Sequence, residues 1–258
     1  MQYNAKAPYL VETHWQIDEV KDGDSIIISN LFTRLRKEIR LYGLDAPEVK
    51  YNRKMKEDEQ KTRLAAQFLI QLGLEALHYV LKVAPPKTVV TIITEQDNFC
   101  DYWNRQLGYV ILPGGECLND LLLINGYAKA TQQYYCGKLA EYQLMNRQAQ
   151  LNQLGIGKND TVSVLLPNIP AMIEAHFAVP MAGAVLNTLN TRLDAKTLAF
   201  MLDHAETKLL LVDSEFSALA QDALALVQHQ IQVIDVHDAE YDGAVKDIGF
   251  IEYETWLA

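Results

Sequence analysis

The sequence lacks a hydrophobic segment long enough to cross a membrane. No stretch of the 258 residues approaches about 18 consecutive apolar residues, the minimum for a membrane-spanning helix. Residues 1–6 also lack the apolar core of a secretory signal peptide. We therefore expect no membrane partner and a cytoplasmic location for the chain as it stands, or secretion if a leader has been lost.

Cysteine is scarce, and its number is odd. The chain has three cysteines, and their spacing is not that of a metal site. This pattern predicts reduced thiols in a reducing compartment rather than a disulfide framework. The residues are Cys100, Cys117 and Cys136.

Positive charge is sparse in the last two-fifths of the chain. Residues 154–258 hold 5 Lys and Arg against 15 Asp and Glu, whereas residues 1–153 hold 18 of each. The formal net charge of −10 therefore comes from the second segment alone. This division implies two parts of different origin, and it argues against strong non-specific affinity for nucleic acid.

Residues 39–48, with the sequence IRLYGLDAPE, carry an arginine and two acids at the end of a predicted strand. The apolar Ile39 and Leu41 alternate with polar residues, as in a strand that packs one face on a core. Gly43 ends this run, and Pro47 biases the residue before it toward an extended conformation. The acids therefore sit on a stiff corner, which suits the binding of a hard cation.

Two further segments complete a pattern with this corner. Residues 22–24 form an Asp-Gly-Asp turn between two strand-like runs, and an arginine at 105 follows the aromatic loop 101–104. Together with Arg-Leu-x-Gly-x-Asp-x-Pro-Glu at 40–48, these segments resemble the signature of the staphylococcal nuclease (thermonuclease) family. The resemblance covers about residues 10–155.

Hydrophobic periodicity predicts an α+β fold for residues 1–155, with five strands in an OB-type β-barrel. The expected strands lie at 13–20, 24–29, 36–43, 88–94 and 106–112. The expected helices lie at 57–81, with an interruption or end near Gly73, at 118–125 and at 134–154.

Strands and helices alternate after residue 156, which is typical of a parallel α/β sheet. The expected strands lie at 161–166, 184–186, 208–212 and 231–236, and the expected helices at 169–177, 194–205 and 215–228. Residues 155–168 and 179–193 look like the early part of an acyl-CoA synthetase of the adenylate-forming, AMP-binding superfamily. The phosphate loop and lid lysine of such enzymes are missing from the sequence. We therefore expect residues 156–258 to be a partial α/β fragment without ATP or CoA turnover.

The nuclease resemblance implies a Ca²⁺ site in the first segment. Asp24 and Asp45 would supply carboxylate ligands, and Ala46 its backbone carbonyl, which is an oxygen set that suits Ca²⁺. The family often has threonine at position 46, but a contact through the carbonyl also allows alanine.

The same resemblance implies three catalytic residues. Glu48 would orient and deprotonate the attacking water, while Arg40 and Arg105 would bind phosphate oxygens as forked donors. The alternative is an inert barrel in which Asp24 caps a turn, Glu48 is solvated and Arg40 pairs with Asp45.

Three aromatic residues are candidates for stacking on unpaired bases: Tyr102, Trp103 and Tyr134. Tyr102 stands where the family often has a lysine that holds a terminal phosphate. The alternative is that these rings pack on the edge of the barrel.

Together, these features predict a Ca²⁺-dependent endonuclease. It would act on DNA and RNA, preferably single-stranded, and leave 3′-phosphate ends. One alternative is an OB-type module that binds nucleic acid without cutting it. The other is an adenylate-forming acyl-CoA ligase, and the missing phosphate loop speaks against it.

Overall fold

The structure is a computed structural model that describes residues 8–257, with the exception of residues 63, 239–240, 242 and 244–245. It divides into two compact units, Met1–Asn146 and Arg147–Ala258. The division falls inside helix α4 (Leu139–Gln153), so the boundary expected at residue 155 stays a prediction. None of the described helices is both long enough and apolar enough to span a bilayer.

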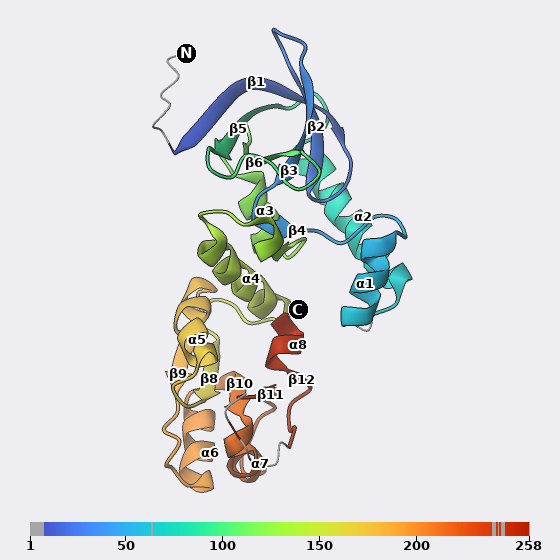
Figure 1. The fold of residues 1–258 in the computed structure, drawn as a ribbon. Coiled ribbons are helices and arrows are strands. Elements are labelled where there is room, and N and C mark those ends of the chain that lie inside the picture. The colour runs from blue at the N-terminus through green and yellow to red at the C-terminus, as the bar shows by residue number, and fades with distance from the viewer. Residues whose placement is uncertain (1–7, 63, 239–240, 242, 244–245, 258) are drawn as a thin grey trace. The chain divides into compact units, whose positions relative to one another are not determined.

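The first unit contains a closed five-stranded barrel with the strand order β1-β2-β3-β6-β5 (Figure 1). Neighbouring strands are antiparallel except β3 and β6, which are parallel. This barrel confirms the predicted OB-type fold. Its strands are β1 (Tyr9–Val20), β2 (Ser25–Asn30), β3 (Arg36–Leu41), β5 (Val89–Glu95) and β6 (Gln106–Ile111).

Alternate β-branched and aliphatic side chains form the interior of the barrel. Ile26 pairs with Ile39 across β2 and β3, and both are almost fully buried, as are Ile28 and Leu41. This alternation is the one that the sequence predicts, and it places the opposite side chains of β3 outside the core.

Two helices follow the corner, α1 (Arg53–Thr62) and α2 (Ala66–Val83). The single helix at 57–81 with an interruption or end near Gly73 was therefore a wrong prediction. Gly73 lies inside α2, where a Cβ atom would come within 2.5 Å of the Glu48 carbonyl oxygen. The glycine is explained by this close approach of the helix to the corner.

The other elements of the first unit are two helices, a pair of two-residue strands and a 3₁₀ turn. The helix expected at 134–154 begins later, at Leu139. Residues 132–134 form a separate 3₁₀ turn, in which the Gln133 N–H donates to the Thr131 hydroxyl. The β4–β7 pair was not predicted. These elements are β4 (Leu44–Asp45), α3 (Leu118–Ile124), β7 (Lys129–Ala130), the 3₁₀ helix η1 (Gln132–Tyr134) and α4.

The second unit is a parallel five-stranded sheet with the order β12 (Ile251–Glu252), β11 (Gln232–Val236), β10 (Thr207–Asp213), β8 (Thr161–Leu165) and β9 (Val185–Thr188). Its helices include α5 (Pro170–Met181), α6 (Ala195–His204) and α7 (Ser217–Leu224). Alternate residues of β10 enter different cores: Leu209 and Leu211 pack with α5, whereas Leu210 and Val212 pack with α6 and α7. Both faces are thus covered, which explains the continuous apolar run of β10.

This sheet confirms the predicted partial α/β fold. The helix expected at 215–228 is shorter, since residues 214–216 are a 3₁₀ turn, and β12 and α8 were not predicted. The elements are β8 (Thr161–Leu165), α5 (Pro170–Met181), β9 (Val185–Thr188), α6 (Ala195–His204), β10 (Thr207–Asp213), the 3₁₀ helix η2 (Ser214–Phe216), α7 (Ser217–Leu224), β11 (Gln232–Val236), β12 (Ile251–Glu252) and α8 (Tyr253–Leu257).

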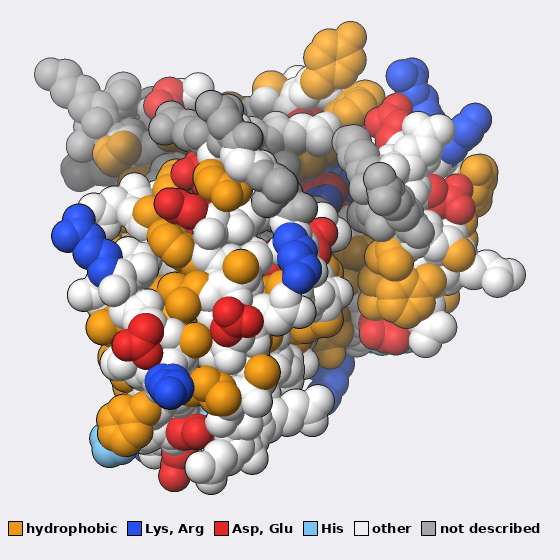
Figure 2. Space-filling view, turned by 90° about the horizontal axis from the view of Figure 1, so that it is seen from below, with side chains coloured by type: hydrophobic (Ala, Val, Ile, Leu, Met, Phe, Trp, Pro, Cys, Tyr) orange, Lys and Arg blue, Asp and Glu red, His pale blue; other side chains and the backbone are white. Residues whose placement is uncertain are grey.

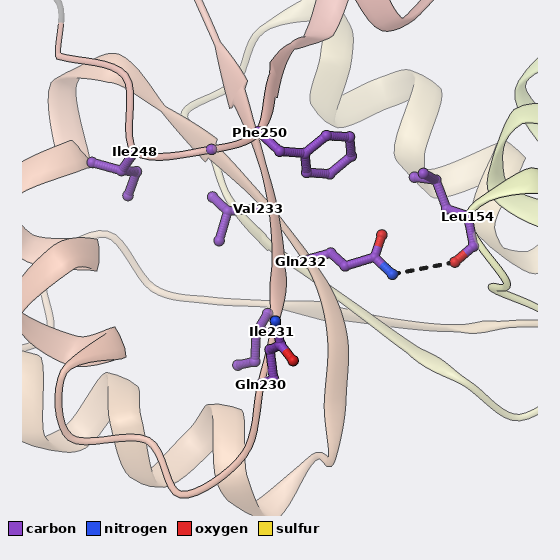
Figure 3. Close-up of a pocket in the computed structure, with 8 residues that line it drawn as sticks. Leu154, Gln230, Ile231, Gln232, Val233, Ile248 and Phe250 are labelled. Atoms are coloured by element: carbon purple, nitrogen blue, oxygen red, sulfur yellow. Dashed lines mark hydrogen bonds between the residues drawn. The ribbon is translucent and has the colours of Figure 1, made fainter.

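A pocket of about 510 Å³ opens in the second unit beside the amino end of β11. Figure 3 shows Gln232 pointing toward Leu154, whose carbonyl accepts a hydrogen bond from the Gln232 amide at 3.4 Å. The eight lining residues include no acid, base or nucleophile. Ligands of open parallel α/β sheets bind at the carboxyl ends of the strands instead, so this pocket carries no evident chemistry.

Candidate active site

The Asp-Gly-Asp turn (residues 22–24), the acidic corner (residues 45–48) and helix α2 pack against one another through small residues. A Cβ atom on Gly23 would lie 2.6 Å from the Ala46 Cβ and 2.8 Å from the Ala76 Cβ. The Asp24 N–H donates to the Asp22 carboxylate at 3.1 Å, which closes the turn. The turn is therefore seated directly on the corner, and this brings Asp24 beside Asp45.

Asp24 and Asp45 share one buried arginine. The Arg40 Nη2 atom lies 2.9 Å from Asp24 Oδ2 and 3.0 Å from Asp45 Oδ1. All three side chains are at least nine-tenths buried. Asp24 Oδ2 also accepts the Ala46 N–H at 2.8 Å, so the expected ligand residues Asp24, Asp45 and Ala46 form one cluster.

Both terminal nitrogens of the Arg40 guanidinium have partners within the protein. Its Nη1 atom donates to the carbonyl oxygens of Leu41 at 3.2 Å and Asp24 at 3.4 Å. Its carbon Cζ lies 3.9 Å from the centre of the Tyr134 ring. The pairing of Arg40 with Asp45, which the inert-barrel alternative foresees, is present, and the predicted contact of Arg40 with a phosphate would require these donors to be shared.

Lys54, in the first turn of α1, brings a second cation to the cluster. Its Nζ atom lies 2.8 Å from Asp45 Oδ1, 3.0 Å from Glu48 Oε1 and 3.5 Å from the Ala46 carbonyl oxygen. Glu48 accepts a further hydrogen bond from Asn52 at 2.8 Å. Glu48 is therefore joined to the acidic pair through an ammonium group and is not simply solvated.

Burial and mutual repulsion shape the acid–base properties of the cluster. Burial raises the pKa of Asp45, and the repulsion of Asp24 adds to this, although Lys54 and Arg40 oppose it. Burial and then the charge of Asp24 raise the pKa of Asp22 to about 7. Burial works to lower the pKa of Lys54, but the attraction of Asp45 and Glu48 outweighs burial and raises it. Lys54 is thus held as a cation.

Arg105 reaches the same end of the barrel from the loop before β6. Its Nε and Nη2 atoms each lie 2.8 Å from Asp101 Oδ2. Its Nη1 donates to Ser25 Oγ at 3.4 Å, and that hydroxyl donates to Asp24 Oδ1 at 3.1 Å. Arg105 is one-quarter exposed, so, unlike Arg40, it offers a guanidinium edge to solvent.

The aromatic candidates line a pocket of about 410 Å³ next to Arg105. Tyr102 is 94% exposed and Trp103 61%, and their rings meet edge to face at 5.7 Å. Tyr134 is buried under the Arg40 guanidinium. Tyr102 and Trp103 therefore have free ring surface for stacking, whereas one face of Tyr134 already packs on Arg40.

The oxygen atoms of the expected metal site already hold a cation in this structure. The ammonium of Lys54 contacts Asp45 and the Ala46 carbonyl, two of the three predicted ligands. Among the described residues no cluster of three or more Asp, Glu, His or Cys side chains is arranged for a metal. The donor set of two carboxylates and a carbonyl is chemically suited to Ca²⁺, and Lys54 marks the position that a cation takes.

Sequence reasoning missed Lys54 and Ser25. Lys54 lies in the charged run Arg53–Lys56, and such a run usually indicates a solvated helix face. Its one distinguishing signal is a lysine in the first turn of a helix, where the helix dipole disfavours positive charge unless acids are close by. Ser25 carries no signal beyond its place after the Asp-Gly-Asp turn.

Two family models match the chain. Residues 38–159 match the model of staphylococcal nuclease homologues, and residues 142–252 match that of AMP-binding enzymes. The chain joins a nuclease-homologue domain to an AMP-binding segment. This confirms the fusion that the two resemblances predict.

The curated relatives resemble the AMP-binding segment. The peroxisomal butyrate–CoA ligase AAE11 of Arabidopsis thaliana is 61% identical over 79 residues, which is 31% of this chain and 14% of that protein. The peroxisomal benzoate–CoA ligase of Arabidopsis thaliana is 50% identical over 98 residues, 36% of this chain and 17% of that protein. The peroxisomal trans-cinnamate:CoA ligase of Petunia hybrida is 49% identical over 106 residues, 39% of this chain and 19% of that protein. The chain thus spans less than one-fifth of the length of these three relatives.

Proposed function

We propose that the nuclease-homologue domain is a Ca²⁺-dependent endonuclease for DNA and RNA, and that the AMP-binding segment has no catalytic activity of its own. The observation that carries the proposal is a cation position that Asp45, Glu48 and the Ala46 carbonyl surround, with Asp24 held beside Asp45 by Arg40. Bound Ca²⁺ supplies Lewis-acid polarisation of the phosphodiester. Hydrolysis of the bond to the 5′ oxygen would leave 3′-phosphate ends.

The residues of this chain have distinct tasks in the proposed reaction. Glu48 orients the attacking water and accepts its proton. Arg105, anchored by Asp101, would turn its Nη1 atom from the long contacts with Ser25 and Glu38, at 3.4 and 3.6 Å, to phosphate oxygens. Arg40 holds the two buried carboxylates in place and is therefore a positioning residue first; a direct phosphate contact would need a rearrangement of its present bonds.

The expected substrate is single-stranded nucleic acid, because Tyr102 and Trp103 expose ring faces on which unpaired bases stack. We expect net charge to contribute little to the affinity for nucleic acid. Residues 1–153 hold 18 basic and 18 acidic side chains, so this part of the chain has no net positive charge. On the one face of the chain that Figure 2 draws, the described basic side chains are scattered among acidic and hydrophobic ones. Stacking and contacts at the site, rather than a broad basic surface, would then provide affinity.

The test is digestion of a single-stranded DNA oligonucleotide by the full chain, in Ca²⁺ and in excess chelator. We expect cleavage only with Ca²⁺, and fragments from the 5′ side of each cut that terminal transferase extends only after phosphatase treatment. Glu48→Gln should lower turnover by about 10²-fold or more. Glu57→Gln, on exposed α1 surface, is the matched control and should cut normally. Equal turnover of both variants would contradict the role of Glu48.

A binding module without catalysis is the second candidate, and the buried Arg40–Asp45 pair favours it. In that case the chain would bind the oligonucleotide, as measured by fluorescence anisotropy, and would not cut it under any condition. A ligase activity is tested by incubation with ATP, CoA and butyrate or benzoate. Formation of a thioester would overturn the assignment of the AMP-binding segment as non-catalytic.

A further inference from the structure

We infer that Lys54 is the resident cation of this site and that a divalent cation binds only when the Lys54 ammonium leaves. Lys54 therefore sets the affinity of the site for Ca²⁺. The inference rests on the proposed function, since it concerns the same Ca²⁺ position. It adds Lys54, a residue that the resemblance to the nuclease family did not single out.

The contacts of Lys54 are those of a bound ion. Its nitrogen touches a carboxylate oxygen of Asp45, a carboxylate oxygen of Glu48 and the Ala46 carbonyl oxygen. Asp45 and Ala46 are two of the predicted Ca²⁺ ligands, and the Asp45 side chain is only 10% exposed. An ion that entered would need the same oxygen atoms, so the two cations exclude each other.

Lys54 is able to leave without unfolding its helix. Its side chain is 31% exposed, and an unbranched four-carbon stem rotates readily into solvent. The next residue, Met55, is fully buried, and its N–H is bonded to Asn52 at 2.8 Å. The backbone of α1 therefore stays anchored while the lysine side chain swings out.

The charge of the cluster favours exchange for a divalent ion. The carboxylates of Asp24, Asp45 and Glu48 face the cations of Arg40 and Lys54. One negative charge is thus in excess while the ammonium is in place. Replacement of the single charge of Lys54 by a double charge removes this excess. A monovalent ion would gain nothing from the exchange, so the lysine also discriminates against monovalent ions.

The size of the effect follows from competition within one molecule. If the ammonium occupies the position in at least nine molecules of ten, the apparent affinity for Ca²⁺ is reduced by about tenfold or more. Removal of the ammonium should restore that factor. Removal of an exposed lysine from the same helix should not.

The experiment is calorimetric titration of the full chain with CaCl₂, for the wild type, Lys54→Met and Lys56→Met. Lys56 is exposed on α1, so its variant makes the same charge change away from the site. We expect Lys54→Met to bind Ca²⁺ at least about tenfold more tightly than the wild type and Lys56→Met to match the wild type. Equal affinities of the two variants, or no Ca²⁺ binding by a folded Lys54→Met, would overturn the inference.

A second measurement needs no variant. Acetic anhydride labels free amines, and mass spectrometry follows the rate at each lysine of the wild-type chain. Saturating Ca²⁺ should speed labelling of Lys54 several-fold relative to Lys56, because the ammonium is displaced into solvent. An unchanged ratio would refute the exchange.

Failure of the inference and failure of the proposed function are distinguishable. If the chain cuts DNA in Ca²⁺ but Lys54→Met leaves its Ca²⁺ affinity unchanged, the proposed function stands and the inference about Lys54 is wrong. If Lys54→Met raises the Ca²⁺ affinity but the chain never cuts DNA, the inference about Lys54 stands and the proposed function is wrong.

Discussion

Removal of Arg40 should destabilise the barrel more than any other single charge change on β3. Arg40→Met keeps much of the length and apolar volume of the stem but deletes the guanidinium. The variant leaves Asp24 and Asp45 buried without their shared partner. It also removes the donors to the carbonyl oxygens of Asp24 and Leu41.

The magnitude follows from the burial of the group. Loss of one partner from a buried charge network costs about 3–5 kcal/mol, because the remaining charges stay desolvated and lose the cation that they share. For a unit of this size such a loss lowers the melting temperature by about 6–20 °C. Arg40→Lys keeps the charge but cannot reach both acids and both carbonyls, so we expect an intermediate loss of about 1–3 kcal/mol.

The assay is differential scanning calorimetry of the full chain, with Arg36→Met as the matched control. Arg36 lies on the same strand, but its side chain is 59% exposed and its pairs with Asp18 and Glu19 are 3.4 and 3.7 Å long. Such a surface arginine contributes about 0–1 kcal/mol. If Arg40→Met and Arg36→Met melted at the same temperature, the buried network would not stabilise the barrel, and the reasoning would be refuted.

Three further outcomes are expected. Gly73→Ala should lower stability by about 1–3 kcal/mol and reduce cleavage, because its Cβ would press on the Glu48 carbonyl at 2.5 Å, whereas Gly157→Ala, with nothing within 4 Å, should be neutral in calorimetry. Iodoacetamide at pH 8 should label the exposed Cys100 well before Cys117, since burial raises the pKa of the Cys117 thiol to about 11 and the thiolate is the reactive form; equal rates in mass spectrometry would contradict this. Asp235→Ala should cost about 1–3 kcal/mol in the unfolding of the second unit, because the buried carboxylate accepts N–H groups of the loop before β12 at 2.7–3.1 Å; an unchanged melting transition would count against it.

The barrel was predictable because its strands alternate in a simple way. Ile39 and Leu41 alternate with charged residues in the sequence, and this period of two places both inside the barrel. The parallel sheet was predictable for the same kind of reason, from β-branched runs separated by helical spacing. The three free cysteines also agree with the prediction from their odd number.

The helix break was not predictable, because the signals point to the wrong place. Gly73 is the only glycine between residues 44 and 107, so the sequence predicts a helix break there. In the structure, this glycine instead allows helix α2 to approach the Glu48 carbonyl closely. The real break lies before Ala66, where Ala65 adopts an extended backbone without a side-chain cap. No Gly, Pro, Asn or Asp marks residues 62–66, so neither turn chemistry nor capping could reveal it.

The site was predictable as a set of residues but not as an arrangement. The resemblance to the nuclease family implies that Asp24, Arg40 and Asp45 belong to one site, and the structure places the three side chains in contact. Whether Arg40 faces a phosphate or the two acids depends on side-chain burial, which local sequence does not reveal. The role of Lys54 depends on where α1 begins relative to the corner, a tertiary property that no pattern in the charged run expresses.

The contact of Gly23 with Ala46 and Ala76 has a consequence for natural variation among related chains. The three positions share a space in which a single added methyl group already collides. We expect a relative that carries threonine at position 46 to make room for its extra atoms by a shift of the turn or of helix α2. We therefore expect these positions, far apart in the sequence, to covary, so that the turn, the corner and the helix that supports them are inherited as one unit.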